Sequence, residues 1–238
     1  MTRPEEAGDD DREQASLERA LRLAVAVGPL GDVTPDTRRR IFHASMLCDY
    51  AAGAIINGSG PDAVPFGLIV RGRLREFVSG EPERQQTVAY IGAGAVFGSS
   101  TLFGRPRLLD MESLTPVRLV RFSLDAFMRL LPGHPDLARA IARQLAHDQH
   151  AALAELRGSA FASMRQRVGR HLLMRAEVDG ETVQLTQKQL AQAVGTVREV
   201  VGRVLAELES DGLVHRESGG FITLDRDRLR AEVGTPPV

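Results

Sequence analysis

Three charged residues near the C-terminus, Arg198, Glu199 and Arg203, have the types and spacing of a DNA-reading helix. At 3.6 residues per turn, these positions lie on one side of a helix. An arginine can donate two hydrogen bonds to guanine, and a glutamate can accept one from cytosine N4. The opposite side of a helix running to about Ser210 would be apolar, through Val197, Val200, Val201, Val204, Leu205 and Leu208. The pattern predicts an amphipathic helix whose polar side reads the major groove.

Simpler interpretations of the charged residues stay open. Glu199 could be the capping-box partner of Thr196, which the sequence Thr196–Glu199 predicts as the helix start. Glu199 could also pair with Arg203 one turn later. Gly202 lies inside the same helix, where glycine costs about 1 kcal/mol relative to alanine. A close approach to DNA would explain that cost.

A second short helix precedes the reading helix. Thr186 and Gln189 have the spacing of a capping box, and Gly195 supplies the turn between the two helices. Two short helices joined in this way predict a helix-turn-helix. After Asp211-Gly212, segments 213–215 and 221–224 predict a β-hairpin wing, and 182–185 predicts a short strand before the first helix. The groups suited to phosphate contacts are the hydroxyls of Thr186 and Thr196, with Gln187 and Lys188.

The elements that must position this helix-turn-helix, called the reading head below, differ along the chain. Residues 4–13 form an acidic tail, and helices are expected over 16–27 and 35–47. Between Tyr50 and Ser123, short β-forming runs alternate with glycines, which predicts a small antiparallel barrel or roll with strands over 68–70, 74–78, 87–91 and 117–122. A helix of about 22 residues follows Pro135, from Asp136 to about Arg157. A break at Gly158-Ser159 and a helix over 163–175 then lead to the head.

The long helix carries an apolar stripe through Leu137, Ile141, Leu145, Ala152 and Leu156. Simple packing on its own domain would need only one such face. Because the stripe is long and contains small alanines, we favour dimerisation through it.

Composition sets broad limits. The 238 residues allow two modest domains, and the formal net charge of −1 gives no bulk basic signature. No apolar run is long enough to cross a membrane, and Met1–Glu13 lacks the apolar core of a signal peptide, so we expect a cytoplasmic protein without a membrane partner. Cys48 is the only cysteine, which excludes a disulfide within the chain.

The chain resembles the CRP/FNR family of bacterial transcription regulators from about Tyr50 to Leu224. The motifs that carry the resemblance are Leu185-Thr186-Gln187-Lys188-Gln189-Leu190-Ala191 and Arg198-Glu199-Val200-Val201-Gly202-Arg203. The resemblance implies an α+β fold with an N-terminal antiparallel β-roll like a cyclic-nucleotide-binding domain, a dimerisation helix and a C-terminal winged helix-turn-helix. The implied parts are a tail over 1–15, a sensor domain over 16–133, the dimer helix over 134–158 and a DNA-binding domain over 159–238.

The same resemblance assigns base reading to Arg198, Glu199 and Arg203. It implies a homodimer on double-stranded DNA with a TGTGA-like inverted repeat. RNA polymerase is a further implied partner, through a loop before Thr182. That loop is short here, with only residues 176–181 between the expected helix and strand.

The effector site departs from the pattern of cyclic-AMP binders in the family. Those proteins carry Phe-Gly-Glu followed by Arg-Ser or Arg-Thr, whereas this chain has Phe97-Gly98-Ser99 followed by Arg107-Leu108. On the dimer helix, Ala152 and Leu153 stand where polar contacts to the purine are expected. Three polar contacts are thus missing, at about 1 kcal/mol or more each. We assign no cofactor; a cyclic nucleotide stays a candidate, but we expect no ordinary cyclic-AMP control. The apolar residues could line a pocket for another ligand, or the protein could bind DNA without one.

Other chemistries find little support. All six histidines lie outside 50–123, so a histidine cluster in the roll is excluded and we expect no metal site. His43 and Cys48 could ligate haem, as could His147 or His150, but packed or solvated side chains are the favoured interpretation. We find no nucleophile–base pair and no Walker motif, so we expect no enzyme. The competing hypothesis is a ligand-binding or protein-interaction module of this fold with a vestigial head.

Overall fold

The computed structural model describes residues 19, 22, 25–26, 28–56, 64–80, 84–179 and 182–233. The predicted tail, and most of the predicted helix over 16–27, lie outside these residues. The chain divides into two compact units, Met1–Leu74 with Ile91–His147, and Arg75–Tyr90 with Asp148–Val238. The helix α4 (Pro135–Phe161) and the strands β4 (Arg73–Gly80) and β5 (Arg84–Gly92) each contribute residues to both units.

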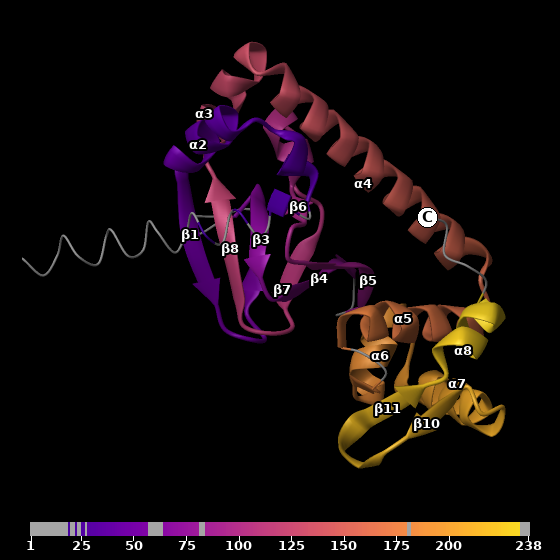
Figure 1. The fold of residues 1–238 in the computed structure, drawn as a ribbon. Helices are drawn as coiled ribbons and strands as arrows, with labels where there is room; N and C mark the ends of the chain where they lie inside the picture. Colours follow the sequence, from indigo (N-terminus) through magenta and orange to yellow (C-terminus); the bar gives the residue numbers. More distant parts are fainter. Residues whose placement is uncertain are drawn as a thin grey trace, which may run out of the picture. The chain divides into compact units, whose positions relative to one another are not determined.

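Two four-stranded sheets form the roll, with strand orders β1-β8-β3-β6 and β2-β7-β4-β5. The remaining strands are β1 (Ser45–Tyr50), β2 (Ile55–Ile56), β3 (Gly67–Arg71), β6 (Val96–Phe97), β7 (Asp110–Ser113) and β8 (Val117–Phe122). In Figure 1, β1, β8 and β3 lie side by side, in agreement with their antiparallel registers. The predicted strands over 68–70, 74–78, 87–91 and 117–122 are confirmed, and so is the roll.

An aromatic cluster anchors helices to the first sheet. Phe66 of the roll meets Phe127 edge to face at 4.8 Å between ring centroids, and Phe122 lies 5.1 Å from Phe66. Phe127 belongs to α3 (Leu124–Leu130), which the sequence analysis did not predict. Leu137 and Ile141 of α4 belong to the same buried cluster. Burying each such side chain stabilises the unit by about 1.5–3 kcal/mol.

The helix predicted over 35–47 is shorter in the structure. The helix α2 spans Pro35–His43, and Ser45 already begins β1. The strand pairs along its whole length with β8, from Ser45 opposite Phe122 to Tyr50 opposite Val117. The prediction was wrong here because pairing with a segment about 70 residues away in the sequence, seen in that same register, outweighs a local preference.

The predicted break at Gly158-Ser159 is also wrong. The helix α4 continues to Phe161, because one glycine costs a helix only about 1 kcal/mol and no proline interrupts it. The next helix, α5 (Met164–Asp179), begins with a reciprocal cap. The amide of Gln166 donates to Ser163 Oγ at 3.2 Å, and the amide of Ser163 donates to Gln166 Oε1 at 3.0 Å. Those two bonds fix where α5 starts.

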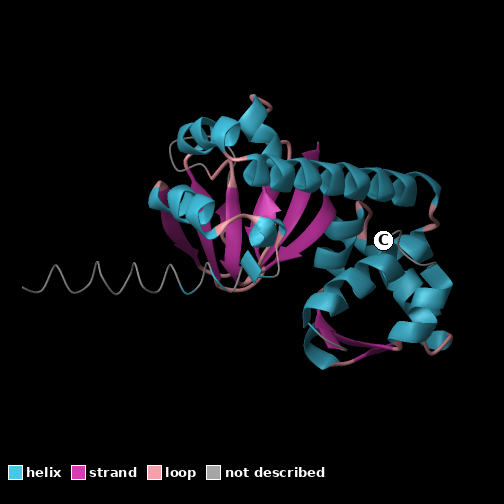
Figure 2. Ribbon diagram, turned by 45° about the horizontal axis from the view of Figure 1, so that its top comes forward, coloured by secondary structure: helices cyan, strands magenta, loops and turns pink. Residues whose placement is uncertain are grey.

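In the second unit, a three-stranded sheet of order β10-β11-β9 lies at the edge of a group of helices (Figure 2). Its elements are β9 (Thr182–Gln184), α6 (Gln187–Val194), α7 (Arg198–Ser210), β10 (Val214–Arg216), β11 (Phe221–Leu224) and α8 (Arg226–Val233). The predicted helix pair and hairpin wing are confirmed, whereas α8 was not predicted. Leu172, Leu190, Val201 and Leu208 lie in one buried core that unites these elements.

The predicted end of α5 needs correction. The helix runs to Asp179 instead of ending near Arg175, and Ala176 is buried in the core. Only residues 180 and 181 therefore separate α5 from β9. Within the described ranges, no helix is both long and apolar enough to span a membrane.

Candidate nucleic-acid interface

The first helix of the pair has the predicted cap and turn. Thr186 Oγ1 accepts from the amide of Gln189 at 3.2 Å, and Gln189 Oε1 accepts from the amide of Thr186 at 2.9 Å. Gly195 ends α6 with φ +71°, a left-handed conformation that glycine adopts without strain. These two ends fix the length of α6 and the direction in which the chain leaves it.

The predicted capping box at Thr196 is wrong. The residue at the N-cap of α7 is Val197, which has an extended backbone and makes no side-chain cap bond. Thr196 instead completes the end of α6, since its amide donates to the carbonyl of Ala191 at 2.9 Å. Its hydroxyl therefore stands one residue too early to cap α7, and Val197 is 53% exposed instead of belonging to the buried side.

The two sides of α7 are well separated. Val201, Val204, Leu205 and Leu208 are buried, whereas Arg198, Glu199 and Arg203 are exposed. With its apolar side held in the core, the N-terminal half of α7 presents two guanidinium groups and a carboxylate to solvent. This arrangement can donate to and accept from the edges of adjacent base pairs.

Gly202 has a neighbour within the protein. A Cβ built there would lie 3.6 Å from Gln187 Oε1, an ordinary contact distance. Gln187 is half-buried at the start of α6, whereas Lys188 next to it is exposed. Gln187 Oε1 also accepts from Arg198 Nε at 3.4 Å. Gly202 was related to DNA alone in the prediction from sequence, whereas in the structure the Gln187 amide lies beside it.

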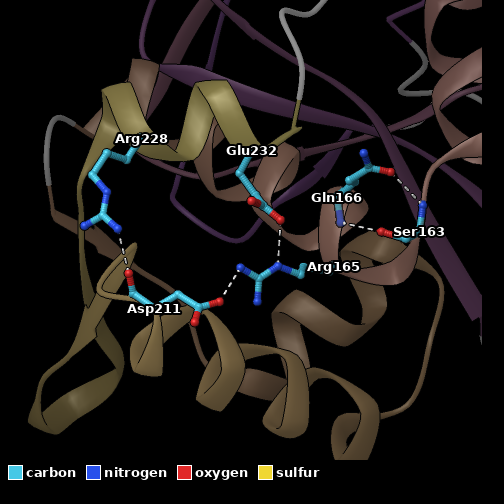
Figure 3. A network of polar contacts seen from close by, with 6 residues as sticks. All are labelled: Ser163, Arg165, Gln166, Asp211, Arg228 and Glu232. Atoms are coloured by element: carbon cyan, nitrogen blue, oxygen red, sulfur yellow. Dashed lines mark hydrogen bonds and ion pairs between the residues drawn. The ribbon is translucent and has the colours of Figure 1, made fainter.

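An ionic network at the far end of α7 was not foreseen either (Figure 3). Arg165 of α5 donates to Asp211 at 2.6 Å and to Glu232 of α8 at 2.8 Å. Arg228 of α8 donates to the carbonyl oxygen of Asp211 at 2.9 Å. The hydrogen bond with Glu232, more than that with Asp211, raises the pKa of Arg165. The network ties the C-terminal end of α7 to α5 and α8.

The wing is tied to α7 by one glutamate. The backbone amide of Arg216 donates to Glu209 Oε1 at 3.0 Å, and its Nε donates to Oε2 at 2.7 Å. The side-chain hydrogen bond to Arg216 lowers the pKa of Glu209, and the backbone bond adds to the effect. These bonds tie β10 to the C-terminal half of α7.

A buried polar cluster lies on α5. His171 hydrogen-bonds to the Tyr90 hydroxyl of β5, and their ring centroids are 5.2 Å apart. Burial lowers the pKa of His171 to about 3, and the charges of Arg75 and Arg175 add to the effect, so the imidazole is neutral at pH 7. No sequence pattern could pair positions 90 and 171, which are 81 residues apart.

The residues singled out for effector binding are not all placed for that role. Ser99 is buried, and the Nη2 of Arg107 donates to the carbonyl of Ile56 at 2.6 Å, whereas Leu108 is 84% exposed. Leu108 therefore does not line a pocket within its unit, contrary to one interpretation above. Ala152 and Leu153 are exposed on the part of α4 that belongs to the second unit.

The backbone around Ser99 is tightly constrained. Gly98 has φ +75° and begins the short helix η2 (Ser99–Phe103). A Cβ there would lie 1.8 Å from the carbonyl oxygen of Pro65, so only glycine fits. The backbone turn that leads into Ser99 is thus fixed by Gly98.

The candidate haem ligands lie apart from any cluster. His43, His147 and His150 are exposed, and Cys48 is half-buried, where burial raises the pKa of its thiol. Among the residues that the structure describes, no three His, Cys, Asp or Glu side chains are grouped to hold a metal ion.

Comparison with known proteins agrees with this architecture. The sequence model of the cyclic nucleotide-binding domain matches residues 47–134, and that of the Crp-like helix-turn-helix domain matches residues 166–232. The chain is 25% identical over 178 residues to the cAMP-activated global transcriptional regulator CRP of Haemophilus influenzae, a match that covers 71% of this chain and 80% of the relative. It is also 25% identical to the CRP-like cAMP-activated global transcriptional regulator of Mycobacterium tuberculosis, over 87% of this chain and 96% of the relative.

Solved structures show the same fold. A CRP/FNR-family transcriptional regulator of Thermus thermophilus aligns with a TM-score of 0.64 and 26% identity, over 81% of this chain and 100% of that one. A regulator of the same family from Eubacterium rectale aligns with a TM-score of 0.73 at 20% identity, over 86% of this chain and 96% of that one.

Proposed function

The chain belongs to the CRP/FNR family of transcription regulators, and on that premise we propose that it is a homodimer that reads an inverted-repeat, TGTGA-like DNA site. The family consists of regulators with a helix-turn-helix DNA-binding domain and not of enzymes.

The observation that carries the proposal is the exposure of Arg198, Glu199 and Arg203 on one end of α7, whose opposite side is buried. Arg198 and Arg203 would donate to guanine, and Glu199 would accept from cytosine. Lys188 and the cap region of Thr186 would contact phosphates and fix the register of the helix in the groove. Thr196 remains in this proposal as a phosphate contact only, because its hydroxyl does not cap α7.

Association of two copies is supported by the second half of α4. Leu153 is 59% exposed and Leu156 is 62% exposed, whereas Leu137 and Ile141 at the other end of the helix are buried. Two large apolar side chains one turn apart, next to the small Ala152, would gain by packing against the same segment of a second chain. A dimer would place two reading helices on the two halves of an inverted repeat.

For the roll, we propose that it biases DNA binding without ordinary cyclic-AMP control. Serine cannot replace the carboxylate that holds the ribose, and Arg107 already donates to the carbonyl of Ile56. Leu108 offers a phosphate no hydrogen bond. We therefore do not carry over to this chain the activation by cAMP that the names of its relatives state.

RNA polymerase would be engaged in a limited way. Only residues 180 and 181 connect α5 to β9, so a long contact loop has no room at that position. We therefore favour regulation by occupying a promoter over contact with polymerase through this connection.

The alternative is a ligand-binding or protein-interaction module with a weak reading head. Selection of bound duplexes from a random pool, using the full chain with and without cyclic AMP, separates the two functions. We expect an enriched inverted repeat that does not depend on cyclic AMP. Failure to enrich any motif, together with tight binding of a small molecule, would favour the alternative.

A further inference from the structure

We propose that Gln187 is a positioning residue that holds the guanidinium of Arg198 ready for base reading. The inference rests on the proposed function, because it concerns how the reading head gains its specificity. It also replaces the role of phosphate contact that the sequence alone assigned to Gln187.

The first step is the contact between the two helix N-termini. Gln187 is the first residue of α6 and Arg198 is the first residue of α7. Arg198 Nε donates to Gln187 Oε1 at 3.4 Å. A guanidinium only donates, so the carbonyl end of the amide must face it. At that distance the bond is weak on its own.

The side chain of Gln187 also lies beside Gly202. Arg198 and Gly202 are one turn apart on the same face of α7. A Cβ at position 202 would lie 3.6 Å from Gln187 Oε1 and 4.0 Å from its Cδ. The amide thus lies along α7 from Arg198 towards Gly202, and a side chain longer than alanine at 202 would compete for its place. Gln187 is half-buried there, which restricts its rotamers.

The chemistry of arginine makes this contact useful. A guanidinium can read guanine with its two terminal nitrogens, which donate to O6 and N7. A bond through Nε does not occupy that pair of donors. Arginine also has high rotamer entropy, and a side chain that is already oriented loses less of it on binding. Gln187 would therefore favour the cognate base pair over others, and would not strengthen binding to all DNA equally.

The test measures the ratio between the affinity for the selected site and the affinity for a changed site. The full-length protein is titrated at fixed salt with the selected site and with a variant of it that is changed at the base pair read by Arg198. That base pair is identified as the one at which Arg198→Ala abolishes discrimination. We expect Gln187→Ala to lower the ratio by about 3- to 10-fold, which is about 0.7–1.4 kcal/mol. In the Arg198→Ala background, Gln187→Ala should change the ratio no further.

Three further variants sharpen the result. Gln187→Glu keeps an acceptor for Arg198, so it should restore most of the ratio while lowering affinity for both DNAs. Lys188→Ala should lower affinity for both DNAs equally. Gln192→Ala, the same change on the same helix, should leave the ratio as it is. Circular dichroism and the midpoint of thermal unfolding check that each variant is folded.

The outcomes separate the inference from the function on which it rests. Equal loss of affinity for both DNAs with Gln187→Ala overturns positioning and supports a phosphate contact. A change of the ratio in the Arg198→Ala background overturns it as well. If Arg198→Ala changes no ratio at any base pair, it is the proposed function that fails.

Discussion

The helix α7 and the roll place their arginines differently. On α7, Arg198 and Arg203 are exposed while the other side of the helix is buried in a core. In the roll, Arg107 donates to a backbone carbonyl of its own unit, and the neighbouring Leu108 is exposed. The difference shows that an arginine is available to an outside partner only where the fold leaves its guanidinium exposed, as it does at Arg198 and Arg203.

The largest effect is expected from shortening a buried side chain of the reading head. Leu208→Ala, at a position with no exposed surface, should lower the free energy of unfolding by about 2–5 kcal/mol, because it leaves a cavity in the core. Leu108→Ala in the roll is the matched control and should change it by less than about 0.5 kcal/mol. Denaturant titration measures both. Similar losses for the two leucines would contradict the burial described here.

The next effect tests the exposed side of the head. Arg198→Ala should weaken binding to the selected site by about 1–3 kcal/mol and relax discrimination at one base pair. Arg107→Ala should leave affinity for that DNA unchanged, since its guanidinium is engaged inside the roll. The measurement is a fluorescence anisotropy titration at fixed salt. Equal loss on random DNA after Arg198→Ala would count against base reading.

A third prediction concerns pH. The pKa of His171 is lowered from its ordinary value of 6.5 to about 3 in the folded protein. The unfolded chain therefore binds more protons than the folded protein between these pH values. The free energy of unfolding has its full value above pH 6.5 and decreases as the pH falls towards 3. The slope should approach about 1.4 kcal/mol per pH unit.

His171→Gln, which can still hydrogen-bond to Tyr90, should remove that slope between pH 6.5 and 5. The carboxylates with lowered pKa, such as Asp136 at about 2, lose their contributions only at more acidic pH and do not disturb this range. Urea unfolding at several pH values makes the comparison. An unchanged slope in the variant would show that other groups cause it.

The smallest effect distinguishes the two threonines of the helix pair. Thr186→Ala should lower the free energy of unfolding by about 1 kcal/mol, because the hydroxyl accepts from the amide of Gln189. Thr196→Ala should cost less, since its hydroxyl caps no helix. Thermal unfolding of both variants gives the difference. A larger loss at Thr196 would reverse the assignment of the caps.

Local signals were sufficient for the frame of the head. The start of α6 was predicted from Thr186 with Gln189, its end from Gly195, and the end of α7 from Asp211-Gly212. Such caps and glycine turns depend on residues that are close in the sequence. The N-cap of α7 was placed one residue too early, at Thr196 instead of Val197, because Thr196 completes the end of the preceding helix. The end of α4 was also placed too early, before Gly158, because a glycine alone does not show whether a helix ends or continues.

The sequence by itself determined the alternation of strands, the long helix and the helix pair, together with the charged residues of α7. Only the tertiary structure decided which polar groups meet: Arg165 with Asp211 and Glu232, His171 with Tyr90, and Arg198 with Gln187. Spacing along one helix or strand is fixed by backbone geometry, and so it can be read from sequence. Contacts between segments depend on how side chains pack when distant parts of the chain fold together, and no local pattern encodes that.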